Sequence, residues 1–208
     1  MSITDRTRST QMGQRLCRTV ESKGGNSSLS FWVWYAHAVA TQPRDAALDD
    51  DHDPHYLHPG RSALILMLDL KLLDPIALGL SLWHDSQDTE LMPDTENLEV
   101  DELVMMPTPD LNIQATSETV LELRTTLPRH GDEELAAKLV VLDHEVACAA
   151  LAERLDHLRH LHLKEPDAAA REVWREARDV WLPFADRTHP DLARRYAWWT
   201  RKFTKRYD

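Results

Sequence analysis

Residues 133–163, EELAAKLVVLDHEVACAALAERLDHLRHLHL, decide the fold of this chain. Apolar residues recur in this stretch at the spacing of one helix face, namely Leu135, Leu139, Leu142, Val146, Ala150, Leu155 and Leu158. Pro166 and Asp167 then interrupt the pattern. The stretch therefore predicts one long helix from Glu133 to about Leu163, which at about 1.5 Å per residue would cross a whole domain.

Further apolar segments of helical length accompany this element, and no run alternates between apolar and polar residues as a half-buried strand would. Asp74 and Pro75 resemble a helix start, since aspartate caps helices and proline fits the first helical position. The other expected helices are 29–40, 61–72, 76–85, 117–126, 168–185 and 190–204, and a linker is expected at 92–112. The predicted fold class is all-α, with Trp174, Trp181, Trp198 and Trp199 in the core.

The chain has 208 residues and a formal charge of −11 with its 11 histidines neutral. Such a length suits one domain, and so acidic a chain is a poor non-specific binder of nucleic acid. Basic residues do gather near the end, but a solvated helix face is the commoner origin of such a cluster. Its members are Arg194, Arg195, Arg201, Lys202, Lys205 and Arg206.

No run approaches the roughly 18–20 apolar residues of a membrane-spanning helix, and residues 1–30 lack the apolar segment of a secretory signal. The only cysteines are Cys17 and Cys148, too few for a disulfide framework. Cys148 lies in an apolar helical stretch and is expected to be a buried free thiol. These features favour a cytoplasmic protein with no membrane partner.

Three groups of residues carry candidate chemistry. His58 precedes Pro59 at a helix start, and the pair His84-Asp85 closes an apolar helix with Asp88 following it. The third group lies within the long helix, where Asp156 and His157 follow Glu153 at helical spacing on one face. Imidazoles and carboxylates together suit a borderline divalent cation such as Mn²⁺, Fe²⁺ or Zn²⁺.

Each group also has a simpler interpretation. A lone His58 is more often a loop or capping residue, and Asp88 alone is more often solvated. Glu153 with Arg154, and Asp156 with Arg159, could be surface ion pairs on a helix. The chain has no glycine-rich phosphate loop, GxSxG elbow, HExxH or CxxC motif, so the commonest competing catalytic schemes lack support.

The order of the groups adds a resemblance. Residues 58–89, HPGRSALILMLDLKLLDPIALGLSLWHDSQDT, resemble the metal-dependent HD hydrolase domain of the RelA/SpoT alarmone enzymes, in which HP and an apolar helix precede HDxxEDT. Residues 151–161, LAERLDHLRHL, are similar to that family's LADRLHNMRTL, and residues 175–187, REARDVWLPFADR, to its RETxEIYAPLAxRLG. The resemblance implies an HD-domain helical bundle over 28–208, preceded at 1–27 by a polar segment and helix.

The resemblance implies a site as well. It places a Mn²⁺ ion on His58, His84, Asp85 and Glu153, the last standing where the family has aspartate. It makes Asp88 the catalytic carboxylate, with Thr89 in place of the family's second acid. It assigns substrate binding to Arg44, Arg154 and His157. A lysine of the family is Ala150 here, and the family's synthetase domain does not follow.

The function that this resemblance implies is Mn²⁺-dependent removal of the 3′-diphosphate from guanosine alarmones. The products would be GDP or GTP and pyrophosphate, and the role would be to relieve the stringent response. Two alternatives stay open, namely an HD phosphohydrolase of another nucleotide such as (p)ppApp, and a catalytically degenerate alarmone-binding protein. The oligomeric state is not predicted.

Overall fold

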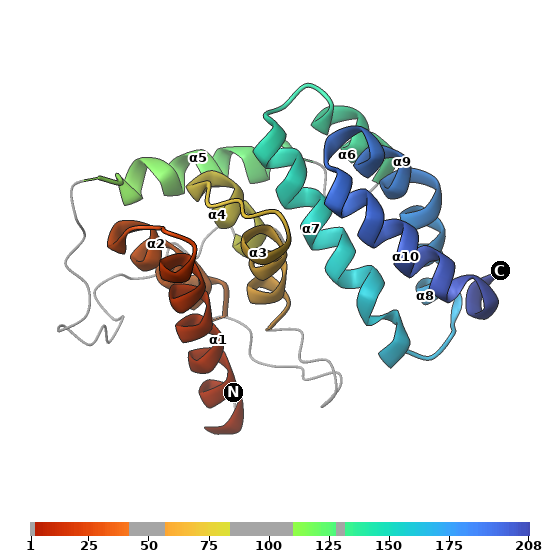
Figure 1. Cartoon of the computed structure of the whole chain (residues 1–208), viewed down its shortest axis with the longest axis horizontal. Helices are drawn as coiled ribbons and strands as arrows, with labels where there is room; N and C mark the ends of the chain where they lie inside the picture. Colours follow the sequence, from red (N-terminus) through yellow and green to blue (C-terminus); the bar gives the residue numbers. More distant parts are fainter. Residues whose placement is uncertain (1–2, 42–56, 84–109, 128–131) are drawn as a thin grey trace.

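A computed structural model describes residues 3–41, 57–83, 110–127 and 132–208. Every element in these ranges is helical, which confirms the all-α prediction (Figure 1). The elements in chain order are α1 (Ile3–Ser22), α2 (Ser27–Thr41), α3 (His58–Asp69), α4 (Pro75–Trp83), α5 (Ile113–Thr126), α6 (Asp132–Leu139), α7 (His144–His160), η3 (Leu161–Leu163), α8 (Ala168–Glu176), η4 (Ala177–Trp181), α9 (Leu182–Thr188) and α10 (Pro190–Tyr207).

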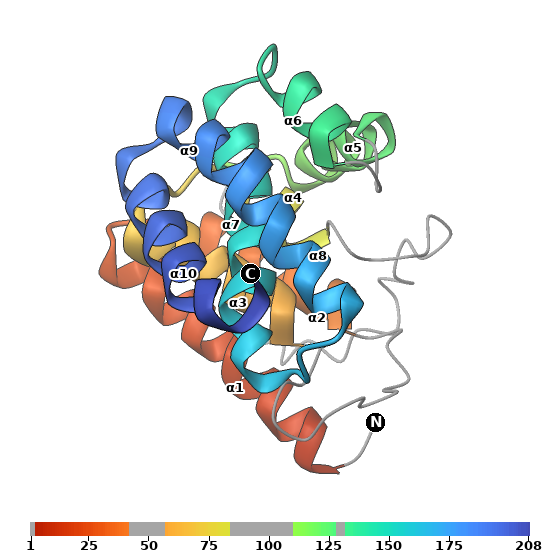
Figure 2. The same ribbon diagram turned by 90° about the vertical axis from the view of Figure 1, so that its right-hand side faces the viewer.

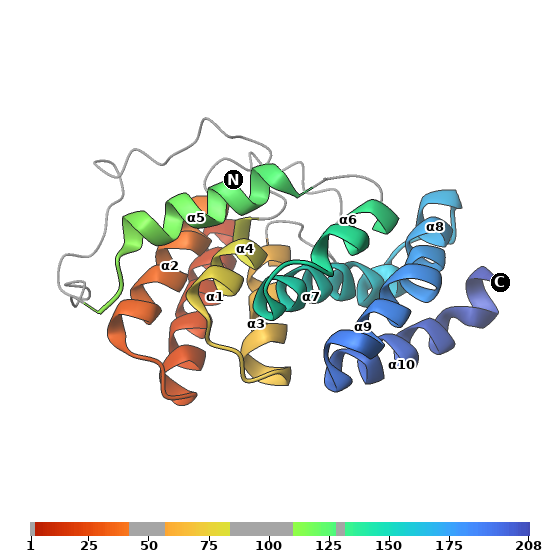
Figure 3. The same ribbon diagram turned by 90° about the horizontal axis from the view of Figure 1, so that it is seen from above.

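Helix α7 lies between two groups of helices (Figure 3). It packs against α3 and α4 of the N-terminal group on one side and against α10 on the other. Seen from the right-hand side of Figure 1, the C-terminal helices α8 to α10 lie in front of the rest (Figure 2). Leu151, Leu155 and Leu158 of α7 are almost wholly buried, because neighbours cover the helix on both sides. The candidate site residues of α7 are therefore held in the middle of the bundle.

The predicted single helix over 133–163 is wrong in one respect, because a turn at residues 140–143 divides it into α6 and α7. Val140 and Val141 are 61% and 82% exposed, and β-branched residues favour helices weakly. Asp143 then starts α7, its backbone carbonyl accepting from the Ala147 N–H at 3.1 Å. Leu139 and Val146 both remain buried across the turn, which is why the apolar spacing did not reveal it.

Polar side chains start several helices. The Asp74 carboxylate accepts from the Ala77 N–H at 2.8 Å, which confirms the predicted cap of α4. Asn112, expected within a linker, accepts from the Ala115 N–H at 3.0 Å, so α5 begins at Ile113 rather than Ser117. Helix α3 has no such side-chain cap. It begins at His58, three residues earlier than predicted, with Pro59 in its first turn.

The prediction for the aromatic core holds for two of its four tryptophans. Trp174 and Trp181 are buried, but Trp198 is 45% exposed, so its assignment to the core was wrong. Trp199 is partly buried against the core. Trp198 instead lies under the Lys202 ammonium, 4.7 Å from the ring centroid, on a solvated face. Cys148 is the buried free thiol expected, and burial raises its pKa to about 11.

The N-terminal helix α1 contributes to the same core as the rest of the bundle, through Leu16 and Val20. It packs against α2 and α3, and Met12 lies where a Cβ at Gly60 would fall. Among the described residues, no helix is both long enough and apolar enough to cross a membrane. The basic cluster of α10 is exposed, as the sequence predicted.

Candidate metal centre

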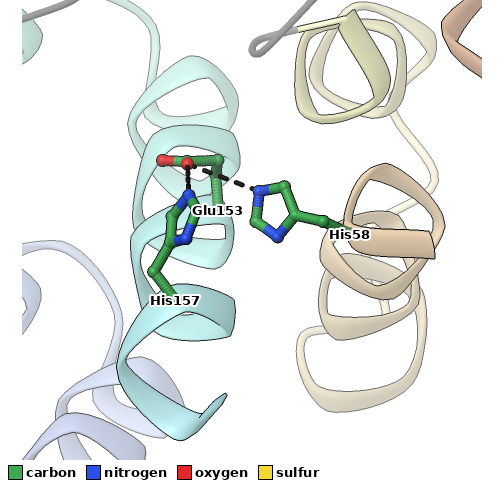
Figure 4. Close-up of side chains that lie close together, drawn as sticks. All are labelled: His58, Glu153 and His157. Atoms are coloured by element: carbon green, nitrogen blue, oxygen red, sulfur yellow. Dashed lines mark ion pairs between the residues drawn. The ribbon is translucent and has the colours of Figure 1, made fainter. Parts of the chain in front are cut away.

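The candidate site forms where the first turn of α3 faces the middle of α7. His58 projects from α3 toward α7, and Glu153 and His157 point back toward it (Figure 4). Glu153 and His157 share a face because they are four residues apart on one helix. Two segments far apart in the sequence thus bring two imidazoles and a carboxylate together.

The three side chains are close enough to share one ion. The Glu153 Oε1 atom lies 2.7 Å from His157 Nε2 and 3.4 Å from His58 Nε2. The two imidazole ring centroids are 4.2 Å apart. One donor atom from each residue lies within 4.8 Å of both others, and this is the only such group found among the described residues. The geometry therefore supplies three converging ligand atoms.

Burial of a carboxylate among these side chains costs free energy unless a cation or a network of donors pairs with its charge. His58 is 3% and Glu153 1% exposed, whereas the His157 side chain keeps 29% of its surface. Nitrogen and oxygen donors of these kinds bind first-row divalent cations such as Mn²⁺, Fe²⁺ and Zn²⁺. The residues present fit such an ion in chemistry and in spacing, with the partial exposure of His157 leaving one side of the group open to solvent.

A second buried carboxylate, that of Asp156, contacts the other ring nitrogen of His58. Asp156 Oδ2 lies 2.7 Å from His58 Nδ1 and 3.0 Å from Arg61 Nε, and Oδ1 lies 2.7 Å from Arg159 Nη2. Burial alone would raise the pKa of the Asp156 carboxyl. The hydrogen bond and charge of His58, with the two arginines, outweigh burial and hold that pKa well below its usual range. His58 and the two arginines thus stabilise the charged form of Asp156.

Arg154, predicted to bind substrate, has carboxylates of the chain as neighbours. Its Nη1 lies 3.1 Å from Glu153 Oε2 and its Nη2 lies 3.2 Å from Asp132 Oδ1. Its guanidinium also lies over the Trp181 ring, 5.8 Å from the centroid, and the Trp181 indole donates to Asp132. Arg154 thus ties the start of α6 to the site on α7.

Glu176 lies beside this arginine and carries an unusual carboxyl. Its pKa is raised to about 7, first by partial burial and then by the charges of Asp132 and Glu172, although Arg154 opposes the shift. Glu176 therefore takes up a proton more readily than an ordinary glutamate.

The structure brings together three of the predicted site residues, His58, Glu153 and His157, with Arg154 beside them. The other predicted residues lie outside the described residues, and their roles stay predictions: Arg44, His84, Asp85 and Asp88. The ion pairs of Arg154 and Arg159 with neighbouring carboxylates do form. They are not surface pairs, however, because both carboxylates are 1% exposed.

Two features of the site did not follow from the sequence. The contact of Asp156 with His58 was missed, and the only signal was the position of Asp156 one turn beyond Glu153. The contact of Asp132 with Arg154 left no local signal, because it joins two helices across a turn. Compared with known proteins, the chain matches no family model and no curated protein.

Proposed function

We propose that this chain is a Mn²⁺-dependent pyrophosphohydrolase that removes the 3′-diphosphate from guanosine alarmones. The observation that carries the proposal is the buried group of His58, Glu153 and His157, whose donor atoms converge from two helices. Two of these residues, His58 and Glu153, are metal ligands by the resemblance to the RelA/SpoT hydrolase domain. His84 and Asp85 complete the ligand set in this proposal.

The contacts of His157 support a different role from the one that the resemblance implies. His157 was assigned to substrate by resemblance, but its Nε2 lies 2.7 Å from the Glu153 carboxylate and faces the same point as His58. We therefore propose His157 as a metal ligand. Its partial exposure places it at the solvent side of the group, where it would also lie close to a bound phosphate.

In the proposed reaction, a bound Mn²⁺ would lower the pKa of a water molecule and polarise a phosphoryl oxygen. Asp88 would accept the proton of the attacking water as general base. Arg44 would neutralise charge on the substrate phosphates. Arg154 would do so only by exchanging a carboxylate partner for phosphate, since its guanidinium contacts Glu153 and Asp132.

A nucleotide panel tests this function. The purified protein is incubated with Mn²⁺ and ppGpp, pppGpp, ppApp or GTP, and the release of pyrophosphate and of orthophosphate is measured. The proposal expects pyrophosphate from ppGpp and pppGpp and none without the metal. Preference for ppApp would assign the site to an adenine alarmone, and release from none of the four would contradict hydrolysis.

A degenerate, alarmone-binding protein is the second candidate, and one observation favours it. The Glu153 carboxylate lies 3.1 Å from the Arg154 guanidinium and 2.7 Å from His157 Nε2, so groups of the chain itself already pair with it. A protein of this kind would bind ppGpp without Mn²⁺ and release no pyrophosphate. Calorimetry with ppGpp in the presence of a chelator separates the two candidates.

A further inference from the structure

The two nitrogens of the His58 ring face different carboxylates. Nε2 faces the metal-binding group, 3.4 Å from Glu153 Oε1, and Nδ1 lies 2.7 Å from Asp156 Oδ2. A neutral imidazole carries its proton on one nitrogen and offers a lone pair on the other. Which nitrogen can ligate a cation therefore depends on what the other nitrogen contacts.

Asp156 is built to be an acceptor at this position. It is wholly buried, with its Oδ2 atom 3.0 Å from Arg61 Nε and its Oδ1 atom 2.7 Å from Arg159 Nη2, so both oxygens accept from donors of the chain. The backbone carbonyl of Asp156 meanwhile lies 2.7 Å from His160 Nδ1, which ties the same residue to the end of α7. A fixed carboxylate against His58 Nδ1 requires a proton on that nitrogen.

We propose that Asp156 is a positioning residue of the metal centre. Its carboxylate accepts the Nδ1–H of His58, locks the ring, and directs the Nε2 lone pair at the cation between Glu153 and His157. The inference rests on the cation site proposed above. Carboxylates that hold the far nitrogen of a ligating histidine commonly contribute about 10–100-fold to metal affinity.

The arrangement also fixes the distance between the ligands. Glu153, Asp156 and His157 lie within two turns of α7, so one rigid helix carries two ligands and the carboxylate that aims the third. His58 is thereby tied to α7 although it belongs to α3.

A buried ion-pair network that only stabilises the bundle would show the same contacts, and Arg159 offers the matched control. Asp156→Asn keeps the shape but loses the charge that holds the Nδ1–H. Arg159→Gln removes a different member of the network and leaves the contact between Asp156 and His58. Both variants should lower the free energy of unfolding, since both disturb buried charges.

The two variants should differ in metal affinity. Asp156→Asn should weaken Mn²⁺ binding about 10–100-fold, measured by calorimetry, whereas Arg159→Gln should change it little. Equal affinities of Asp156→Asn and the parent, or equal losses in the two variants, would overturn the inference while the metal site itself stands. Failure of the parent to bind Mn²⁺ would instead contradict the proposed function.

The contact between His58 and Asp156 can also be tested in the parent protein, which does not require Asp156→Asn to fold. With ¹⁵N-labelled histidine in the metal-free protein, NMR reports which nitrogen of the His58 ring carries a proton. We expect a proton on Nδ1, at low field and slow to exchange because Asp156 accepts it. A His58 ring without a proton on Nδ1 would overturn the inference, whatever the protein does with Mn²⁺.

Discussion

Glu153 is the residue on which the proposed metal centre depends most. Its carboxylate is 1% exposed and lies between His58, His157 and Arg154. A glutamate reaches further from the backbone than an aspartate by up to about 1.5 Å, one carbon–carbon bond. The longer side chain brings Glu153 Oε1 to 2.7 Å from His157 Nε2 and 3.4 Å from His58 Nε2.

Substitution of Glu153 should separate its charge from its reach. Glu153→Gln should weaken Mn²⁺ binding and turnover together, because an amide is a poorer ligand for a divalent cation than a carboxylate. Glu153→Asp should retain part of both, since the ligand chemistry is kept and the reach is shorter. Calorimetry with Mn²⁺ and pyrophosphate release from ppGpp measure the two effects.

The exposed Glu172, paired with Arg175 on the surface, is the control for this substitution. Glu172→Gln removes the same charge from the chain and should leave Mn²⁺ affinity unchanged. Binding by Glu153→Gln as tight as that of the parent would show that Glu153 is not a ligand, and would favour the degenerate candidate.

The sequence predicted the site in part. The ligand types and the shared face of Glu153 and His157 followed from helical spacing, and the pairing of His58 with Glu153 followed from the family resemblance. The partner of His58 Nδ1 did not follow, because a ring has two nitrogens and only packing decides which of them faces Asp156. The roles of Arg44, His84, Asp85 and Asp88 remain predictions, because these residues lie outside the described ranges.

At the scale of elements, α4 is held by a close approach at Gly79. A Cβ at that position would fall 2.5 Å from Trp32 Cζ2 on α2 and 2.8 Å from Val120 Cγ2 on α5. The Trp32 indole donates to the Pro75 carbonyl at 2.8 Å, and the Trp83 indole donates to the Ala36 carbonyl at 2.9 Å. These hydrogen bonds restrain both indole rings. His84, a proposed metal ligand, follows α4 directly in the sequence.

Gly79→Ala should lower the free energy of unfolding, and the sign of this change tests the packing around α4. Helix propensity alone would make alanine more stable than glycine by about 1 kcal/mol. Overpacking against Trp32 and Val120 should cost about 1–3 kcal/mol and outweigh that gain. Urea denaturation measures the free energy of unfolding. A variant more stable than the parent would show that α2, α4 and α5 are not packed as described.

Helix existence could be predicted here and helix boundaries less well. Segments with an apolar face, such as residues 190–204, formed helices because burial rewards that face wherever the ends lie. The turn between α6 and α7 could not be foreseen, because Leu139 and Val146 keep the apolar spacing across it. Trp198 was assigned to the core by residue type, although its place on α10 faces solvent.

Across the whole molecule, one buried histidine should make stability depend on pH. His37 of α2 is 3% exposed, its Nε2–H donates to the Ser9 carbonyl at 3.1 Å, and its Nδ1 has no hydrogen-bond partner in the described part of the chain. Burial lowers its pKa to about 4, although the Ser9 carbonyl opposes the shift. The unfolded chain, whose histidine titrates near its ordinary pKa of 6.5, therefore binds this proton more readily.

The contribution of neutral His37 to the free energy of unfolding should be fully present above about pH 6.5. It should be lost as the pH drops from about 6.5 toward 4, since the unfolded state takes up the proton first. At pH 5 the loss from His37 amounts to about 2 kcal/mol. His37→Gln keeps a donor for Ser9 and should reduce the pH dependence of the free energy of unfolding, measured by urea denaturation, by that amount. The exposed His162, changed to Gln, is the control, and equal slopes for the parent and His37→Gln would refute this origin.

The proposed binding of Mn²⁺ at the buried group of His58, Glu153 and His157 can be measured by titrating the protein with Mn²⁺ and following the free ion by electron paramagnetic resonance. We expect the parent to remove Mn²⁺ from solution at one ion per chain and His157→Gln, changed at the partly exposed ligand, to bind it more weakly. No binding by the parent, or equal binding by His157→Gln, would contradict it.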